Sequence, residues 1–195
     1  MFTGIIETLG TIIDIQKEKS NITFTIKSSI SDELRVDQSL AHDGVCLTVV
    51  KVANNMHKVT AIDETLQKSN LNKWEINSKI NLERCTKINE RLDGHIVQGH
   101  IDCVAICEKI EDVSGSWKFT FKANEASKKL IVEKGSISIN GVSLTVVNSI
   151  GNFFSVAIIP YTYKNTSFCN IEKGSLVNIE YDIIGKYVLK ILGES

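Results

Sequence analysis

The sequence predicts an all-β protein made of two related modules and a short C-terminal helix. First, the segment DGVCLTVV at residues 43–50 returns 97 residues later as NGVSLTVV, with six of eight positions identical. Second, both modules contain short runs in which apolar and polar residues alternate, which is typical of half-buried strands. Third, the last residues carry apolar side chains at helical spacing. Internal repeats of this kind indicate duplication of one structural unit.

The composition is that of an ordinary globular protein. The chain has 195 residues, 43% of them hydrophobic, with 22 Lys and Arg against 23 Asp and Glu. A disordered chain would need lower hydrophobicity and a higher net charge. Nucleic-acid binding needs an excess of cations, so the balanced charge argues against it. We expect no signal peptide, because no basic stretch precedes the first apolar residues, and no membrane span. These features predict a cytoplasmic protein.

Five cysteines are expected to be reduced thiols, since their number is odd and no secretion signal is expected. They are Cys46, Cys85, Cys103, Cys107 and Cys169. The closest pair, Cys103 and Cys107, falls on a predicted strand. Residues four apart on a strand are about 13 Å from each other, too far to hold one metal ion. We therefore expect no metal site.

The elements of each module follow from alternation and turn residues. Residues 21–26 predict a strand, and residues 45–52 and 58–62 predict a hairpin around Asn54 and Asn55. Gly151 and Asn152 separate the corresponding strands of the second module. Short strands joined by turns favour barrels or sandwiches over βαβ units. Residues 124–134 predict a helix that ends at Gly135. Asp93 and Gly94 predict the junction, giving modules 1–94 and 95–182.

The tail, residues 183–195, predicts a helix with one apolar stripe. The stripe consists of Ile184, Tyr187, Val188, Ile191 and Leu192. So short a helix is marginal in isolation and needs to be buried. Packing on its own barrel and packing against a copy of itself are both open. The duplication likewise allows two related pockets for two similar ligands, or a repeat that serves stability alone.

Several motifs together resemble one family. They are Met1–Glu7, His42–Val49, Asn81–Arg84, Gly94–Asp102 and Asn140–Val146. In combination, and over nearly the whole chain, they resemble riboflavin synthase of the alpha-chain type. The resemblance implies two six-stranded Greek-key barrels that bind lumazine, at 1–94 and 95–182, and an oligomerisation helix at 183–195 that holds a homotrimer.

The resemblance also implies the reaction. Two molecules of 6,7-dimethyl-8-ribityllumazine become riboflavin and 5-amino-6-(D-ribitylamino)uracil by transfer of a four-carbon unit, the final step of riboflavin biosynthesis. No cofactor is implied. The active site would lie between the N-terminal barrel of one subunit and the C-terminal barrel of its neighbour. The implied partners are two substrate molecules, further copies of the chain and lumazine synthase, with no nucleic acid and no membrane.

The resemblance assigns substrate-binding positions to both modules. In the first they are Phe2, Gly4, Ile5, Ile6, Ser39, Cys46, Leu47, Thr48, Thr60, Ala61, Ile62, Asp63, Glu64 and Thr65. In the second they are Gly99, His100, Ile101, Lys134, Ser143, Leu144, Thr145, Ile158, Ile159, Pro160, Tyr161, Thr162 and Tyr163. Residues two apart on a strand share a face, so Cys46 points with Thr48, and Ser143 with Thr145.

The catalytic candidates are His100, Ser143, Cys46 and Asp182. The reaction needs removal of a methyl proton, and a histidine can move protons near neutral pH. The other three are candidates for activating or delivering a nucleophile, although water or a ribityl hydroxyl could serve instead. Ser143 corresponds to Cys46, so the two pockets are expected to differ chemically.

Each candidate has a structural alternative. Cys46 could be a small buried apolar residue, and Asp182 could cap the tail helix. The histidines could be structural, with His57 on the surface. Rival functions for the whole chain are a lumazine- or flavin-binding optical protein, the flavin barrel of a reductase and an assembly module. No Gly-rich dinucleotide motif supports the reductase.

Overall fold

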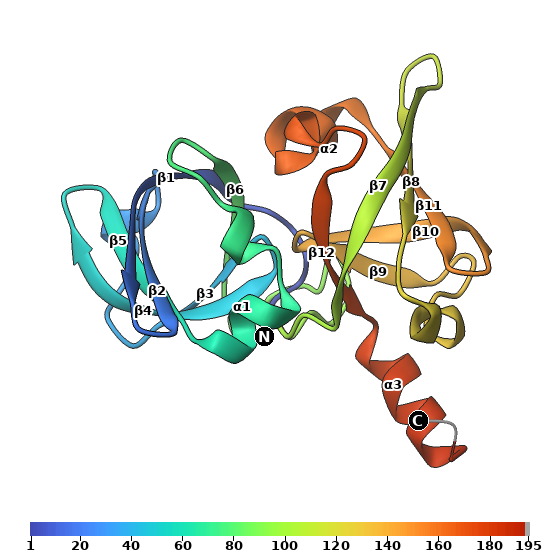
Figure 1. Ribbon diagram of the computed structural model, residues 1–195, viewed down its shortest axis with the longest axis horizontal. Helices are drawn as coiled ribbons and strands as arrows, with labels where there is room; N and C mark the ends of the chain where they lie inside the picture. Colours follow the sequence, from blue (N-terminus) through green and yellow to red (C-terminus); the bar gives the residue numbers. More distant parts are fainter. Residues whose placement is uncertain (194–195) are drawn as a thin grey trace.

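The computed structural model describes residues 1–193 and contains two closed six-stranded antiparallel barrels side by side (Figure 1). The first consists of β1 (Thr8–Glu18), β2 (Asn21–Lys27), β3 (Ser39–His42), β4 (Val45–Ala53), β5 (Met56–Ala61) and β6 (Lys79–Arg84). The second consists of β7 (Cys103–Asp112), β8 (Trp117–Lys122), β9 (Ser136–Ile139), β10 (Val142–Ile150), β11 (Phe153–Ile158) and β12 (Leu176–Tyr181). The predicted fold class is confirmed.

Short helices lie between strands or, in the case of α3, follow the last strand. They are α1 (Asp63–Lys68), α2 (Pro160–Asn165) and α3 (Ile183–Ile191), with single 3₁₀ turns at Ser31–Glu33, Leu71–Lys73, Glu125–Lys129 and Ser167–Asn170. Strand order is β1-β2-β5-β4-β3-β6 in the first barrel and β10-β11-β8-β7-β12-β9 in the second. A connector, residues 85–102, joins β6 to β7, and the junction predicted at residue 94 falls inside it.

The predicted hairpins are present. Asn54 and Asn55 lie between β4 and β5 with φ of 55° and 58°, the left-handed conformation that asparagine tolerates better than most residues. Alternate residues of the strands face the barrel interiors. In the second barrel this places Phe119, Phe121 and Phe154 fully inside. Burial of these apolar side chains supplies the main stabilisation of each barrel.

The helix predicted over residues 124–134 is wrong. Only the 3₁₀ turn Glu125–Lys129 forms there. Leu130, Ile131 and Val132 are consecutive apolar residues, and a helix would spread them over different faces. Instead the chain bends, so that Ile131 enters the core and Lys134 adopts a φ of 65° before β9.

The duplicated motifs meet each other at the interface between the barrels. A Cβ on Gly44 would lie 2.7 Å from the backbone nitrogen of Gly141. Around this contact the equivalent asparagines reach across: Asn81 Nδ2 donates to the Asn140 carbonyl at 2.8 Å, and Asn178 Nδ2 donates to the Asp43 carbonyl at 2.9 Å. The repeat therefore has an approximate two-fold arrangement in space.

His57 is buried, contrary to the surface position predicted for it, because it belongs to a hydrogen-bond chain inside the first barrel. Its Nε2 lies 2.9 Å from His42 Nε2, and its Nδ1 lies 2.8 Å from Ser31 Oγ. His42 Nδ1 lies 3.0 Å from the Leu40 carbonyl, which can only accept. One arrangement satisfies every contact: Ser31 donates to His57, His57 donates to His42, and His42 donates to Leu40, with both rings neutral.

We expect both rings to stay neutral in mildly acidic solution. Burial and the neighbouring ring hold the pKa of His42 well below 6.5, and burial lowers the pKa of His57 to about 4. Since the unfolded chain binds protons more readily, the pair's contribution to the free energy of unfolding is complete above pH 6.5 and is lost as the pH falls towards about 4.

Nitrogen-15 chemical shifts of labelled histidines check this prediction. Two rings should show opposite neutral tautomers that persist at about pH 6, where a free imidazole is mostly protonated. Titration of either ring near the ordinary pKa would contradict it.

The tail helix α3 extends away from both barrels (Figure 1). Asp182 caps it, since its Oδ1 accepts a hydrogen bond from the Ile184 amide at 3.0 Å. The predicted stripe does not pack on its own chain: Ile184, Tyr187 and Ile191 are 62%, 63% and 83% exposed. Residues 194 and 195 of the predicted tail segment lie outside the described residues. No helix within residues 1–193 is long and apolar enough to cross a membrane.

Candidate active site

Two crossing segments each run from one barrel to the other and form part of the pocket there. The N-terminal segment, residues 2–6, runs to the second barrel, where the Gly4 carbonyl accepts a hydrogen bond from the Ser143 amide at 2.8 Å. The connector segment, residues 97–101, runs to the first barrel, where the Gly99 carbonyl accepts from the Cys46 amide at 2.9 Å. Phe2 and Val97 pair with each other where the two segments meet.

The N-barrel pocket is a cavity of about 220 Å³. It is lined by Val45, Cys46, Glu64, Thr65, Lys68, Ser69, Gly99, His100 and Ile101. Cys46 comes from β4, Glu64 and Thr65 from α1, and His100 from the connector. Ile101 also packs against the core of the first barrel. The pocket therefore brings together the two catalytic candidates Cys46 and His100.

The C-barrel pocket is a cavity of about 410 Å³. It is lined by Ile5, Asp93, Gly94, Ser136, Ser143, Leu144, Thr145, Val147, Ala157, Ile159 and Thr162. Ser143 and Thr145 come from β10, and Thr162 comes from α2. Ile6 packs against the core of this barrel. The predicted face shared by Ser143 and Thr145 is thus the face that lines a pocket.

The predicted grouping of the crossing segments is wrong. The order of residues in the chain assigns residues 4–6 to the first module and residues 99–101 to the second. The hydrogen bonds from Ser143 and Cys46 place them on the opposite barrels. Each pocket is consequently built from both halves of the sequence.

His95 is a site residue that sequence reasoning missed. Its Nδ1 lies 2.6 Å from Ser143 Oγ. Burial lowers the pKa of His95, and the negative charge of Asp182 opposes that shift. A neutral ring can accept the Ser143 proton, which is the arrangement that activates a serine hydroxyl. His95 precedes the repeated part of its module and has no counterpart in the first, so comparing the halves could not identify it.

Gly94 makes room for this pair. A Cβ there would lie 2.0 Å from the Thr3 carbonyl oxygen and 2.8 Å from Ser143 Cβ. Only glycine lets the connector pass this close, so Gly94 helps set the distance between His95 and Ser143. The next polar atom of the ring, His95 Nε2, is buried with no hydrogen-bond partner in the part of the chain that the structure describes.

Cys46 differs from its counterpart Ser143. It is half-buried, and burial raises the pKa of its thiol above 9.0. At neutral pH it is therefore a protonated thiol and a weak hydrogen-bond donor, not a nucleophilic thiolate. The nearby Ser39 carbonyl accepts from the Cys85 thiol at 3.4 Å. The expected chemical difference between the two pockets is present in these side chains.

The remaining predicted binding residues fall into three groups. Leu47, Ala61 and Ile158 face the barrel cores, so only their backbones could meet a ligand, and Phe2 is also buried. Thr60 Oγ1 bonds to Thr23 Oγ1 at 2.9 Å, and Tyr163 stacks on Trp117 with ring centroids 4.0 Å apart. The exposed members are Ile62, Asp63, Lys134, Pro160, Tyr161 and, on β4, Thr48.

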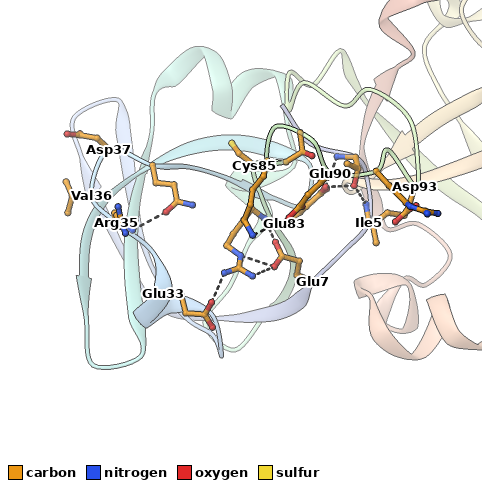
Figure 2. Close-up of a pocket in the computed structure, with 16 residues that line it drawn as sticks. Ile5, Glu7, Glu33, Arg35, Val36, Asp37, Glu83, Cys85, Glu90 and Asp93 are labelled. Atoms are coloured by element: carbon orange, nitrogen blue, oxygen red, sulfur yellow. Dashed lines mark hydrogen bonds and ion pairs between the residues drawn. The ribbon is translucent and has the colours of Figure 1, made fainter.

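A further cavity of about 730 Å³, larger than either of these pockets, lies between the first barrel and the connector (Figure 2) and shares Ile5 and Asp93 with the lining of the C-barrel pocket. Arg84 lies in it and bonds to Glu7 and Glu33 at 2.5 and 2.7 Å. None of His95, His100, Cys46 or Ser143 lines it. Ionic side chains line much of this cavity, and the Ser143 hydroxyl and the His95 imidazole lie outside its lining. Among residues 1–193, no group of three or more His, Cys, Asp and Glu side chains is arranged to hold a metal ion.

Comparison with known proteins finds one domain family twice in the chain. The family described as lumazine binding domain matches residues 3–85 and 98–182. Riboflavin synthase of Actinobacillus pleuropneumoniae is 39% identical over 193 residues, covering 98% of this chain and 90% of that protein. Riboflavin synthase of Saccharomyces cerevisiae is 36% identical, covering 97% and 85%.

Solved structures share the fold. LumP complexed with riboflavin superimposes with a TM-score of 0.87 at 24% identity, covering 93% of this chain and 99% of that one. LumP complexed with 6,7-dimethyl-8-(1'-D-ribityl) lumazine gives a TM-score of 0.84 at 25% identity, covering 92% and 98%.

Proposed function

Since this chain belongs to the riboflavin synthase family, we propose that each of its two pockets holds one molecule of 6,7-dimethyl-8-ribityllumazine during the reaction. The enzyme converts two such molecules into riboflavin and 5-amino-6-(D-ribitylamino)uracil. The two substrates are identical, so one gains the four-carbon unit that the other loses. No external electron acceptor is needed. The observation that carries the proposal is the pair of equivalent pockets, one of which is lined by Ser143, whose hydroxyl contacts His95.

The pockets differ in the groups they offer, which supports different roles for the two substrates. His95 contacts Ser143, which lines the C-barrel pocket, and as a neutral ring it can accept the hydroxyl proton, so that the hydroxyl can activate or deliver a nucleophile to the ring of one lumazine. In the N-barrel pocket, His100 is exposed beside Cys46 and can take or return the methyl proton of the other. Asp182 acts on the C-barrel pocket through its charge near His95.

We propose that a complete active site forms between subunits of a homotrimer. Ile159 lines the C-barrel pocket and is 58% exposed, and its counterpart Ile62 in the first barrel is 53% exposed. The apolar stripe of α3 is exposed as well. Large apolar side chains gathered at pocket mouths and on a helix mark an interaction surface. An N-barrel pocket of one subunit facing a C-barrel pocket of its neighbour would bring the two substrates together and exclude water.

The proposal extends to the cellular setting. The protein acts in the cytoplasm, where its five free cysteines stay reduced, and it associates with lumazine synthase, the enzyme that makes its substrate.

A cofactor-free assay tests the function. Pure protein dialysed against a chelator should convert 6,7-dimethyl-8-ribityllumazine into riboflavin. The absorbance of riboflavin measures the rate. Addition of zinc or magnesium should leave the rate unchanged, because the described residues offer no metal site. The second candidate is a binding protein like LumP, which the shared fold favours. Tight binding of lumazine without formation of riboflavin would support that candidate instead.

A further inference from the structure

Two buried glutamates occupy equivalent positions in the barrels and have no part in the chemistry described above. Glu83 lies on β6 and Glu180 lies on β12, 97 residues apart. Their exposed fractions are 4% and 1%. Burial raises the pKa of both carboxyl groups, and hydrogen bonds from backbone amides oppose that shift. A buried carboxylate needs such partners to remain charged.

The partners of Glu83 all belong to the N-terminal crossing segment. Glu83 Oε1 accepts from the Thr3 amide at 2.6 Å and from Thr3 Oγ1 at 2.8 Å, and Oε2 accepts from the Gly4 amide at 3.0 Å. Figure 2 shows Glu83 beside the segment that carries Ile5. The carbonyl of the same Gly4 receives the Ser143 amide. A carboxylate of the first barrel thus holds the segment that completes the C-barrel pocket.

Glu180, in the second barrel, makes the equivalent contacts with the crossing segment that runs to the first barrel. Its Oε1 accepts from the Gln98 amide at 2.6 Å, and its Oε2 accepts from the Gly99 and His100 amides at 2.8 and 2.9 Å. The Gly99 carbonyl receives the Cys46 amide, and His100 lines the N-barrel pocket. A carboxylate of the second barrel holds the segment that completes the N-barrel pocket.

Each crossing segment lies directly against a strand of the opposite barrel. Gly4 and Gly99 have φ of 79° and 84°, and a Cβ on either would lie 2.5 Å from the Cβ of Ser143 or Cys46 respectively. Neither position has room for a side chain, so the backbone of each segment lies directly against the strand that carries Ser143 or Cys46. The charge-assisted hydrogen bonds of each glutamate hold the segment in this position.

We propose that Glu83 and Glu180 are positioning residues, each of which aligns the segment that forms the pocket of the opposite barrel. Substitution of one glutamate should then alter the pocket of the other barrel, across the interface. The inference rests on the proposed function only in treating the pockets as substrate sites, and its test uses readouts that need no turnover.

The test compares Glu180→Gln with Glu83→Gln in the full-length protein. An amide places an N–H against the backbone donors and removes the charge. Glu180→Gln should raise the alkylation rate of Cys46 by iodoacetamide roughly tenfold and leave the titration of His95 unaltered. The rate constants of the thiolate form are compared, because, besides burial, the charge of Glu180 itself raises the pKa of this thiol. Glu83→Gln should move the pKa of His95 towards its ordinary value and leave the Cys46 rate unaltered. Peptide mass spectrometry and histidine NMR give the two readouts.

Exposed Glu172→Gln is the matched control and should change neither readout. If either glutamine variant fails to fold, the aspartate at the same position, which keeps the charge but is shorter, is used with the same readouts. A folded variant that disturbs the pocket of its own barrel, or neither pocket, would overturn the proposal. If each variant alters the pocket of the opposite barrel as expected but the wild-type protein forms no riboflavin, the proposed function is refuted and this inference stands.

Discussion

Replacing Ser143 with alanine is expected to lower kcat by roughly 10²- to 10⁴-fold, the range that positioned proton-transfer groups contribute. The reason is the 2.6 Å contact between Ser143 Oγ and His95 Nδ1, which couples a hydroxyl to a neutral base. Substrate affinity should change much less, because alanine keeps the shape of the pocket. Steady-state kinetics and fluorescence titration of the ligand give the two quantities separately.

The same experiment with His95→Gln should give a similar loss, and the double variant should be no worse than either single one. Residues that act as a unit show such non-additivity. Ser149→Ala, on the same strand but outside the pocket, is the control. The part of the acidic fall in kcat/KM that His95→Gln removes should lie below the ordinary histidine range, because burial lowers the pKa of His95. Retention of near wild-type kcat by Ser143→Ala would remove the pair from the mechanism.

Disrupting the tail helix should abolish most activity without unfolding the barrels. Tyr187→Glu combined with Val188→Glu places two charges in the exposed stripe of α3, where side chains are 63% and 49% exposed in the single chain. If subunits bury this stripe, desolvating two unpaired carboxylates would dissociate them. Each chain would then retain both pockets but lack the neighbour that faces them.

Analytical ultracentrifugation and turnover measured on the same sample check this prediction. The mass should fall from that of a trimer to that of one chain, and the rate should fall with it. Lys190→Gln, in the last turn of α3, is the control. A monomeric variant with full activity would show that one chain suffices, and an unchanged mass would show that α3 is not the interface.

The duplication made most of the fold predictable. Alternating residues and paired asparagines at 54 and 55 determine strands and turns locally, which left barrels and sandwiches both open, and the two six-stranded barrels were expected from the resemblance. The helix predicted over 124–134 is wrong because the sequence pattern indicates a helix for three adjacent apolar residues, whereas Ile131 enters the core, Leu130 packs against its edge and Val132 is exposed. The burial of His57 was missed because its partners, His42 and Ser31, are distant in sequence.

The site was predictable as residue types but not as an arrangement. Polar residues two apart on β10 predicted a face that lines a pocket, whereas on β4 Cys46 lines its pocket and Thr48 does not. The crossing of residues 4–6 and 99–101 depends on backbone hydrogen bonds to the opposite barrel, which no periodicity in the sequence reveals. The Ser143–His95 pair joins residues 48 positions apart and could be recognised only once the connector was folded.

The mass balance of the reaction tests the central claim most directly. Purified protein is incubated with 6,7-dimethyl-8-ribityllumazine as the only added organic compound, and all three species are quantified by chromatography over time. Two pockets that hold a donor and an acceptor predict that two lumazines disappear for each riboflavin formed, with one 5-amino-6-(D-ribitylamino)uracil released. Riboflavin formed in any other ratio, or no riboflavin from protein that binds lumazine, would contradict the account.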